Sequence, residues 1–177
     1  FYGFEGPILF EENPKPLTLL PESSVPNNYQ KFWILDEDSA KYLSIVHGDY
    51  YKGVNSLKFS GYGKTDSLEV NKVVAMAPEG SLKLKAGDYN LSAKLWLDQG
   101  IIANKIHVTL KNPSLEVAFK DLQKLPRRTW ITVEAKISRT AVSAKDDKLT
   151  IEIRKEDLPK TRAAKLFIDD IAIKAIK

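Results

Sequence analysis

The sequence KLFIDDIAIK at residues 165–174 decides the fold that we expect, because it is rich in β-branched and aromatic residues and predicts a β-strand. With a side-chain period of two, Phe167, Asp169, Ile171 and Ile173 fall on one face of this strand. A carboxylate is thereby placed among three apolar side chains that favour the core, where an unpaired charge is costly. Asp169 is therefore expected either to lie at a solvated strand end or to have a partner.

A hard cation such as Ca²⁺ is one candidate partner for Asp169, because it binds carboxylate and carbonyl oxygens. Glu5 is the candidate matching acid, since the first and last strands of a domain commonly lie close together. In the alternative interpretation, Asp169 and Asp170 end a strand near solvent. Residue chemistry alone favours that alternative.

The rest of the chain offers roughly ten short segments of strand character, separated by turn signals and without a strong helical period. The longest, residues 89–97, alternates between two rows. One row is apolar and the other polar: Tyr89, Leu91, Ala93, Leu95 and Leu97 against Asn90, Ser92, Lys94 and Trp96. This pattern predicts an all-β fold, an antiparallel two-sheet sandwich or a barrel. Residues 66–77 leave a strand and a short helix open.

Composition limits the classes of protein to consider. With 177 residues the chain is expected to form a single domain over residues 1–177. The absence of cysteine excludes a disulfide framework, a zinc–thiolate site and a thiol nucleophile. The net charge of +4 comes mainly from dispersed lysines. We expect no nucleic-acid partner, since no basic block is dense enough, and no membrane span, since no apolar run is long enough.

Catalytic motifs are missing from the sequence. His47 and His107 are the only histidines, and the nucleophile-elbow, phosphate-loop and His-Glu-x-x-His patterns do not occur. Carboxylates are plentiful, but their spacing singles out no glycosidase-type pair. The sequence therefore predicts a protein that is not an enzyme.

A sugar-binding surface is predicted on the polar rows. Trp96 shares its row with Lys94, and His107 lies on the outward row of the next strand with Lys105 and Thr109. If those two strands are neighbours, one exposed face carries the indole, the imidazole and lysines. An indole face can stack on a sugar ring while polar side chains orient it. The alternative is that a loop covers Trp96, as half-buried packing.

Loop tyrosines form a second candidate set for ligand binding. Tyr50, Tyr51 and Tyr62 lie beside glycines, where they either line a sugar-binding cleft or cover the open end of the core. Trp33 and Trp130 are interpreted as structural.

Several stretches, in this order, resemble jelly-roll carbohydrate-binding modules of the family 4, 9 and 22 type, within the galactose-binding-like superfamily. Phe4-Glu5 resembles the end of the opening Asn-Gly-Asp-Phe-Glu signature. Residues 51–59 are similar to the Gly-x-x-Ser-Leu strand entry, and residues 84–95 to the Gly-x-x-Tyr-x-Leu-Ser-Phe-Trp-Val strand. Residues 130–133 are similar to the Trp-Thr-x-Val strand, and residues 166–173 to the closing Tyr-Ile-Asp-Asp-Val-x-Leu strand. Ala93 and Lys94 stand where Phe and Trp are usual.

The resemblance implies a two-sheet jelly roll whose first and last strands share a structural Ca²⁺, with Glu5 and Asp169 as ligands. It implies a non-catalytic domain of a secreted or cell-surface bacterial protein that binds polysaccharide or oligosaccharide. The lysine excess makes an anionic glycan one candidate ligand. Other domains of a larger chain are expected as companions. The alternative is a structural or adhesin-type sandwich that accompanies a polysaccharide-degrading enzyme without a glycan site of its own.

Overall fold

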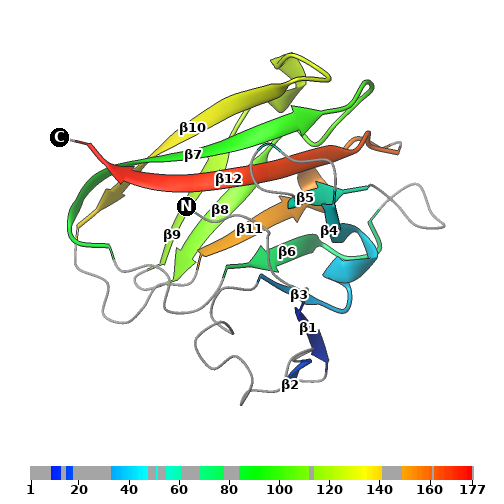
Figure 1. Ribbon diagram of the computed structural model, residues 1–177, viewed down its shortest axis with the longest axis horizontal. Helices are drawn as coiled ribbons and strands as arrows, with labels where there is room; N and C mark the ends of the chain where they lie inside the picture. The colour runs from blue at the N-terminus through cyan, green and yellow to red at the C-terminus, as the bar shows by residue number, and fades with distance from the viewer. Residues whose placement is uncertain are drawn as a thin grey trace.

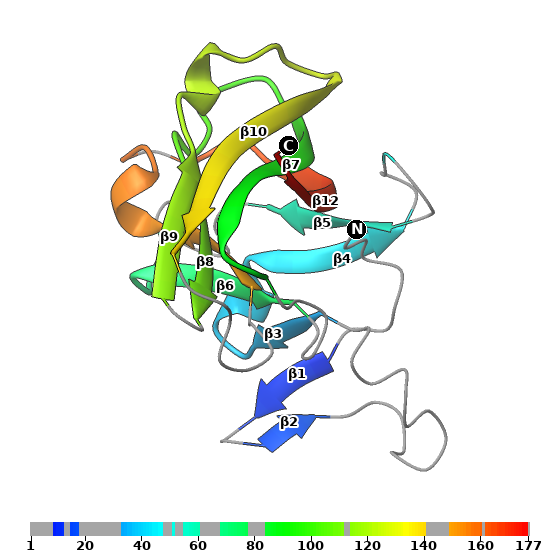
Figure 2. The ribbon, with the colours of Figure 1, turned by 90° about the vertical axis from the view of Figure 1, so that its left-hand side faces the viewer.

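Two β-sheets stacked face to face account for the fold (Figure 1 and Figure 2), in a computed structural model that describes residues 9–12, 15–17, 33–47, 51, 55–60, 68–77, 84–111, 114–140, 149–160 and 162–176. The five-stranded sheet has the order β10 (Trp130–Arg139), β7 (Gly87–Leu97), β12 (Leu166–Ala175), β5 (Asn55–Phe59) and β4 (Leu43–His47). The seven-stranded sheet has the order β2 (Lys15–Leu17), β1 (Leu9–Glu12), β3 (Ile34–Asp36), β6 (Lys72–Met76), β11 (Leu149–Arg154), β8 (Ile106–Lys111) and β9 (Ser114–Phe119).

The predicted all-β, two-sheet sandwich is thereby confirmed, and its topology is that of a jelly roll. Described strand pairs are antiparallel except β1–β3, which is parallel. Short 3₁₀ helices, η2 (Ser39–Lys41), η3 (Leu122–Lys124) and η4 (Lys155–Asp157), are the helical elements of the described part. The open choice at residues 66–77 is settled, because residues 72–76 form strand β6. Residues 15–17 form β2, which pairs with β1.

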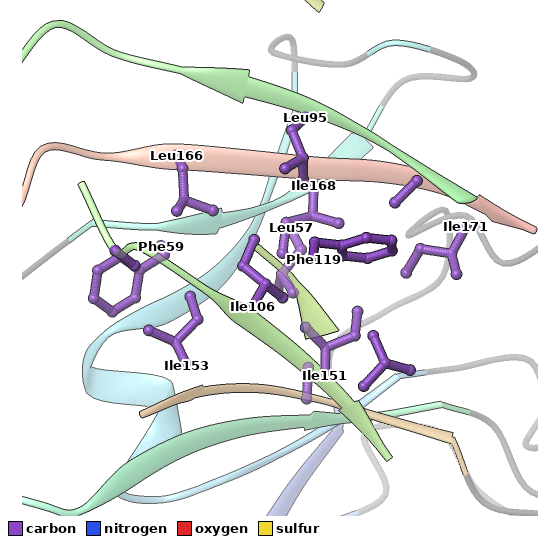
Figure 3. Close-up of a cluster of buried hydrophobic side chains, with 14 of the residues drawn as sticks. Leu57, Phe59, Leu95, Ile106, Phe119, Ile151, Ile153, Leu166, Ile168 and Ile171 are labelled. Atoms are coloured by element: carbon purple, nitrogen blue, oxygen red, sulfur yellow. The ribbon is translucent and has the colours of Figure 1, made fainter. Parts of the chain in front are cut away.

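The core lies between the sheets and follows the alternation of the strands. On β7, Leu91, Ala93, Leu95 and Leu97 are buried, whereas the intervening residues are only partly covered. Figure 3 shows side chains of both sheets meeting in this layer, with Leu95 and Ile168 from one sheet and Ile106, Ile151 and Ile153 from the other. Burial of such side chains is the main contribution to the stability of a sandwich. The row of β7 that carries Lys94 and Trp96 is left on the outer face.

A β-bulge interrupts β12 in the tail segment. Asp169 is opposite Lys94 of β7, but the next pair in register is Ala172 with Ser92, so β12 has one residue more than its partner. Asp170 adopts a left-handed backbone with φ of 47°. A bulge of this kind reverses the side-chain alternation beyond it. Phe167 and Asp169 therefore lie on the outer face, which corrects the prediction that they share the core row with Ile171 and Ile173.

Candidate functional site

An aromatic row crosses the outer face of the five-stranded sheet. Strand register places Trp130 of β10 opposite Trp96 of β7, Trp96 opposite Phe167 of β12, and Phe167 opposite Lys58 of β5. We call these four residues the aromatic row. The row runs perpendicular to the strands, because directly paired residues of neighbouring strands lie side by side on one face.

The rings of the row are held by contacts with one another. Trp96 meets Phe167 edge to face, with ring centroids 5.4 Å apart and an interplanar angle of 73°. Such T-shaped pairs are a preferred aromatic geometry. The ammonium nitrogen of Lys58 lies 5.9 Å from the Phe167 centroid. Phe167 is only 4% exposed, so it is a buried support, whereas Trp96 and Trp130 stay partly open to solvent.

Tyr51 lies beside this row, next to Lys94 and Trp130. The centroid of its ring is 6.0 Å from the Trp130 centroid, and Lys94 Nζ lies 4.7 Å from the Tyr51 centroid, within cation–π range. Lys94 Nζ also donates to Thr132 Oγ1 of β10. The Tyr51 side chain remains 45% exposed. Trp96, Lys94 and Tyr51, three of the predicted ligand-binding residues, therefore lie on one surface.

The carboxylate of Asp169 lies on this same face but is buried, with 1% of the residue exposed. Its Oδ2 accepts the backbone N–H of Tyr51 at 2.9 Å, and its Oδ1 accepts the backbone N–H of Asp170 at 2.7 Å. A carboxylate oxygen that accepts a hydrogen bond can also bind Ca²⁺, so the predicted role of Asp169 as a Ca²⁺ ligand stays a prediction. Glu5, the other predicted ligand, lies outside the described residues.

His107 does not belong to this surface, which corrects the prediction for it. Its strand β8 is in the seven-stranded sheet, so β7 and β8, although consecutive, are not neighbours. His107 is only 6% exposed, with Nδ1 at 3.0 Å from Glu116 Oε1 and Nε2 at 2.6 Å from Asp157 Oδ2. The doubly protonated ring is the form that donates from both nitrogens. A sugar cannot reach a histidine held in this way.

An ion-pair cluster surrounds His107 on the seven-stranded sheet. Arg154 contacts Glu116 at 2.8 Å and Glu152 at 2.9 Å, and Lys72 contacts the other oxygen of Glu152 at 3.2 Å. The hydrogen bond from Arg154 is the main cause that lowers the pKa of Glu116, and the same bond raises the pKa of Arg154. His107, Arg154 and Lys72 are each paired with carboxylates of Glu116, Glu152 or Asp157, so we interpret this cluster as structural.

The nearest arrangement to a metal site within the described ranges also falls in this region. His107, Glu156 and Asp157 offer ligand atoms within 4.8 Å of one another. Both nitrogens of His107 already face carboxylate oxygens at hydrogen-bonding distance. A metal ion would require neutral imidazole with a free lone pair. The arrangement therefore fits an imidazolium better than a metal ion.

The two hollows that are lined by described residues lie away from the aromatic row. A pocket of about 550 Å³ is lined by Asn71, Lys72, Arg154, Lys155 and Glu156, and one of about 360 Å³ lies over residues 109–111 and 114–116. Both belong to the seven-stranded sheet and are built mainly from charged and polar side chains. The aromatic row is a different kind of surface, in which two partly exposed indoles, those of Trp130 and Trp96, lie side by side on the sheet.

Sequence reasoning missed part of this surface. The sequence pattern predicts a structural role for Trp130 and a place on the core row for Phe167, and it does not single out Lys58. The signal that identifies them is the cross-strand register, since Trp130 and Phe167 flank Trp96 directly. Tyr50 and Tyr62 lie outside the described residues, so their predicted role is untested.

Comparison with known structures shows the fold of carbohydrate-binding modules. A family 16 carbohydrate-binding module is 15% identical, with 83% of this chain and 93% of that chain covered and a TM-score of 0.51. The CBM22-1 xylan-binding domain from Paenibacillus barcinonensis is 13% identical over 82% and 86%, also with a TM-score of 0.51. A cyclase from Fischerella sp. TAU is 10% identical over 81% and 84%, with a TM-score of 0.54.

At these identities the likeness extends to the fold alone, and that fold occurs in binding modules and in an enzyme. No family model matches the sequence, and no curated protein matches it. Among the described residues, no helix has the length and apolar character needed to cross a membrane.

Proposed function

We propose that the outer face of the five-stranded sheet binds a polysaccharide or oligosaccharide chain without catalysing a reaction, as a module of a secreted or cell-surface protein. The observation that carries this proposal is the aromatic row, in which Trp130 and Trp96 stay partly open above the buried support of Phe167. The carbohydrate-binding modules that share the fold support the proposed class of ligand.

The accessible part of the aromatic row favours stacking on sugar rings. Trp130 and Trp96 face each other on neighbouring strands, which lie about 4.8 Å apart, and both stay partly exposed, whereas Phe167 is buried. The apolar C–H face of a sugar stacks on an indole, and nearby polar groups then set its orientation. Lys94, Thr132 and Lys58 supply such groups next to the rings.

The chemistry of the face supports binding in preference to catalysis. Asp169 is buried on this face, and both of its oxygens are engaged by backbone N–H groups, so it does not face a ligand on the exposed rings. His107, a natural general base, is buried in the other sheet. Lys58, Lys94 and Thr132 lie next to the rings, where they can hydrogen-bond and orient a ligand.

The decisive experiment is affinity electrophoresis of the parent protein and of Trp96→Ala through gels that contain xylan, soluble cellulose derivatives, β-1,4-galactan or an acidic polysaccharide. We expect the parent to be retarded by one of these and Trp96→Ala to lose at least ten-fold in affinity. Ile101→Ala is the matched control, because Ile101 is an exposed apolar residue in the connection after β7 and outside the sheet.

Stability must be followed in the same variants. Trp96 is partly buried and packs edge to face on Phe167, so its removal should cost about 1–3 kcal/mol of folding free energy. Equal retention of parent and Trp96→Ala would refute the proposed surface. Absence of retardation on every polysaccharide, at low and at moderate salt, would favour the alternative of a structural or adhesin-type domain. Retention confined to low salt would indicate a non-specific cationic surface.

A further inference from the structure

We infer that Asp169 is a positioning residue, which fixes Tyr51 as a side wall of the sugar-binding surface. This inference rests on the proposed function, since it concerns the same face of the molecule. The inference also gives a function to the bulge in β12, which the fold and the aromatic row leave unexplained. With Tyr51 in place, the surface has a second ring-bearing side next to the aromatic row.

The first step of the argument is the bond between two distant parts of the chain. Asp169 Oδ2 accepts the N–H of Tyr51 at 2.9 Å across a separation of 118 residues. This carboxylate is buried, so the bond is charge-assisted and shielded from water, which makes it stronger than an ordinary surface hydrogen bond. The backbone of Tyr51 is therefore tied to β12 at a defined point of the sheet.

The second step is the bulge, which directs the carboxylate toward Tyr51. In a regular strand Asp169 would share its face with Ile171, but Ile171 lies in the core and Asp169 is on the outer face opposite Lys94. The left-handed backbone of Asp170 and its N–H bond to Asp169 Oδ1 at 2.7 Å fix the rotamer of the carboxylate. Bulges commonly redirect a single side chain beside a functional site.

The third step is the position of the Tyr51 ring. It is bounded by Trp130 at 6.0 Å between centroids and by Lys94 Nζ at 4.7 Å, and it is still 45% exposed. A ring that touches the aromatic row and remains open to solvent can contact a ligand lying on that row. Fixing the ring in advance removes an ordering cost that binding would otherwise include.

The test begins with the position of the ring and requires no ligand. In the parent, the Hε protons of Lys94 should show an upfield ring-current shift in NMR spectra, because Lys94 Nζ lies over the Tyr51 ring. Tyr51→Ala should abolish this shift, and Asp169→Asn should remove most of it, since the neutral carboxamide has one acceptor oxygen for the two N–H groups of Tyr51 and Asp170 and loses the charge that strengthens both bonds. Asp36→Asn is the matched control, because Asp36 also accepts a backbone N–H, from Ser39, but belongs to strand β3 of the seven-stranded sheet. It should leave the Lys94 signal unchanged.

The second arm measures the dissociation constant for the polysaccharide that retards the parent most strongly, among those in the gel experiment. We expect Tyr51→Ala and Asp169→Asn each to weaken binding by about three- to thirty-fold, and the double variant to bind no more weakly than Tyr51→Ala. Asp169→Asn replaces the carboxylate by a carboxamide of the same size, so we expect the fold to persist. Circular dichroism of the variant checks that it is folded.

Two outcomes would overturn the inference without touching the proposed function. One is a Lys94 shift that survives Asp169→Asn. The other is parent-like affinity of Asp169→Asn on a polysaccharide that Trp96→Ala no longer binds. If the parent binds no polysaccharide, the proposed function fails, and the NMR arm still decides whether Asp169 holds Tyr51 in place.

Discussion

Asp169 and Ile171 are two residues apart in β12, yet their side chains point to opposite faces of the five-stranded sheet. Asp169 is opposite Lys94 on the outer face, and Ile171 packs in the core. The left-handed residue Asp170 between them makes this possible, because it absorbs the extra residue of the bulge. The carboxylate is thereby kept out of the apolar core, where an isolated charge would be strongly destabilising.

The backbone of Asp170 leads to the first prediction. Glycine adopts a φ of 47° without strain, whereas a β-branched residue does so at a cost of about 1–3 kcal/mol. We expect Asp170→Gly to change the free energy of unfolding by less than about 0.5 kcal/mol and Asp170→Val to lower it by about 1–3 kcal/mol, as measured by urea titration. Lys136→Val, at an exposed position of regular strand β10, is the control and should be nearly neutral. Equal stability of both valine variants would show that the bulge tolerates any residue.

The same bulge shows what the sequence could and could not predict. The alternation of β7 predicted its buried and outer rows correctly, because that strand runs unbroken from residue 87 to 97. The same rule failed for Phe167 and Asp169, because one inserted residue reverses the faces. The sequence KLFIDDIAIK contains two adjacent aspartates, and aspartate tolerates a left-handed backbone at either position. The sequence alone therefore does not show that Asp170 is the irregular residue.

The pairing of strands explains the remaining errors. Consecutive strands often pair, which made β7 and β8 the expected neighbours and brought His107 to the side of Trp96. In a jelly roll the chain instead crosses between the sheets after Leu97, so β7 pairs with β10 and β12. Trp130 and Phe167 become part of the surface only through these pairings between distant segments. Alternation within one strand carries no information about them.

Calcium remains a prediction, based on Asp169 and on Glu5 outside the described residues. We expect a chelator such as EDTA to lower the melting temperature of the parent and to have no effect on Asp169→Asn. An ion at about 100 times its dissociation constant stabilises the folded state by about 2.7 kcal/mol. Differential scanning calorimetry with and without chelator measures the difference. A parent transition that is insensitive to chelator would contradict a Ca²⁺ site at Asp169 and would favour a structural role through its bonds to the N–H groups of Tyr51 and Asp170.

Acid should destabilise the protein through Glu116. Its folded-state pKa lies below the usual glutamate value, mainly because of the hydrogen bond from Arg154, with a further contribution from His107. The folded state therefore binds fewer protons than the unfolded state in this range. The stabilisation is present above the unfolded pKa of about 4.3 and is lost as pH falls through the lower folded value.

Urea titrations at a series of pH values test this expectation. Glu116→Gln should make the decline in unfolding free energy below about pH 4.3 shallower than in the parent. Glu134→Gln, at an exposed position of β10, should leave the slope as it is. Identical slopes for the parent and Glu116→Gln would show that other carboxylates cause the acid sensitivity. The effect on stability should be small, because the Glu116 side chain is 48% exposed and solvent screens its pair with Arg154.

His107 should be the most sensitive member of the ion-pair cluster. Removing it leaves Asp157, whose side chain is only 11% exposed, without the donor that lies 2.6 Å away. A buried acceptor that loses its partner costs about 1–3 kcal/mol, so His107→Ala should lower the unfolding free energy by at least that amount. His107→Gln restores a donor to one of the two carboxylates and should recover part of the loss. Lys41→Ala, which breaks an exposed pair with Asp38, should cost less than about 0.5 kcal/mol.

Glycan affinity should be unchanged in all three variants, because β8 and the aromatic row belong to different sheets. A loss of affinity in His107→Ala at full folding would mean that the seven-stranded sheet takes part in binding after all.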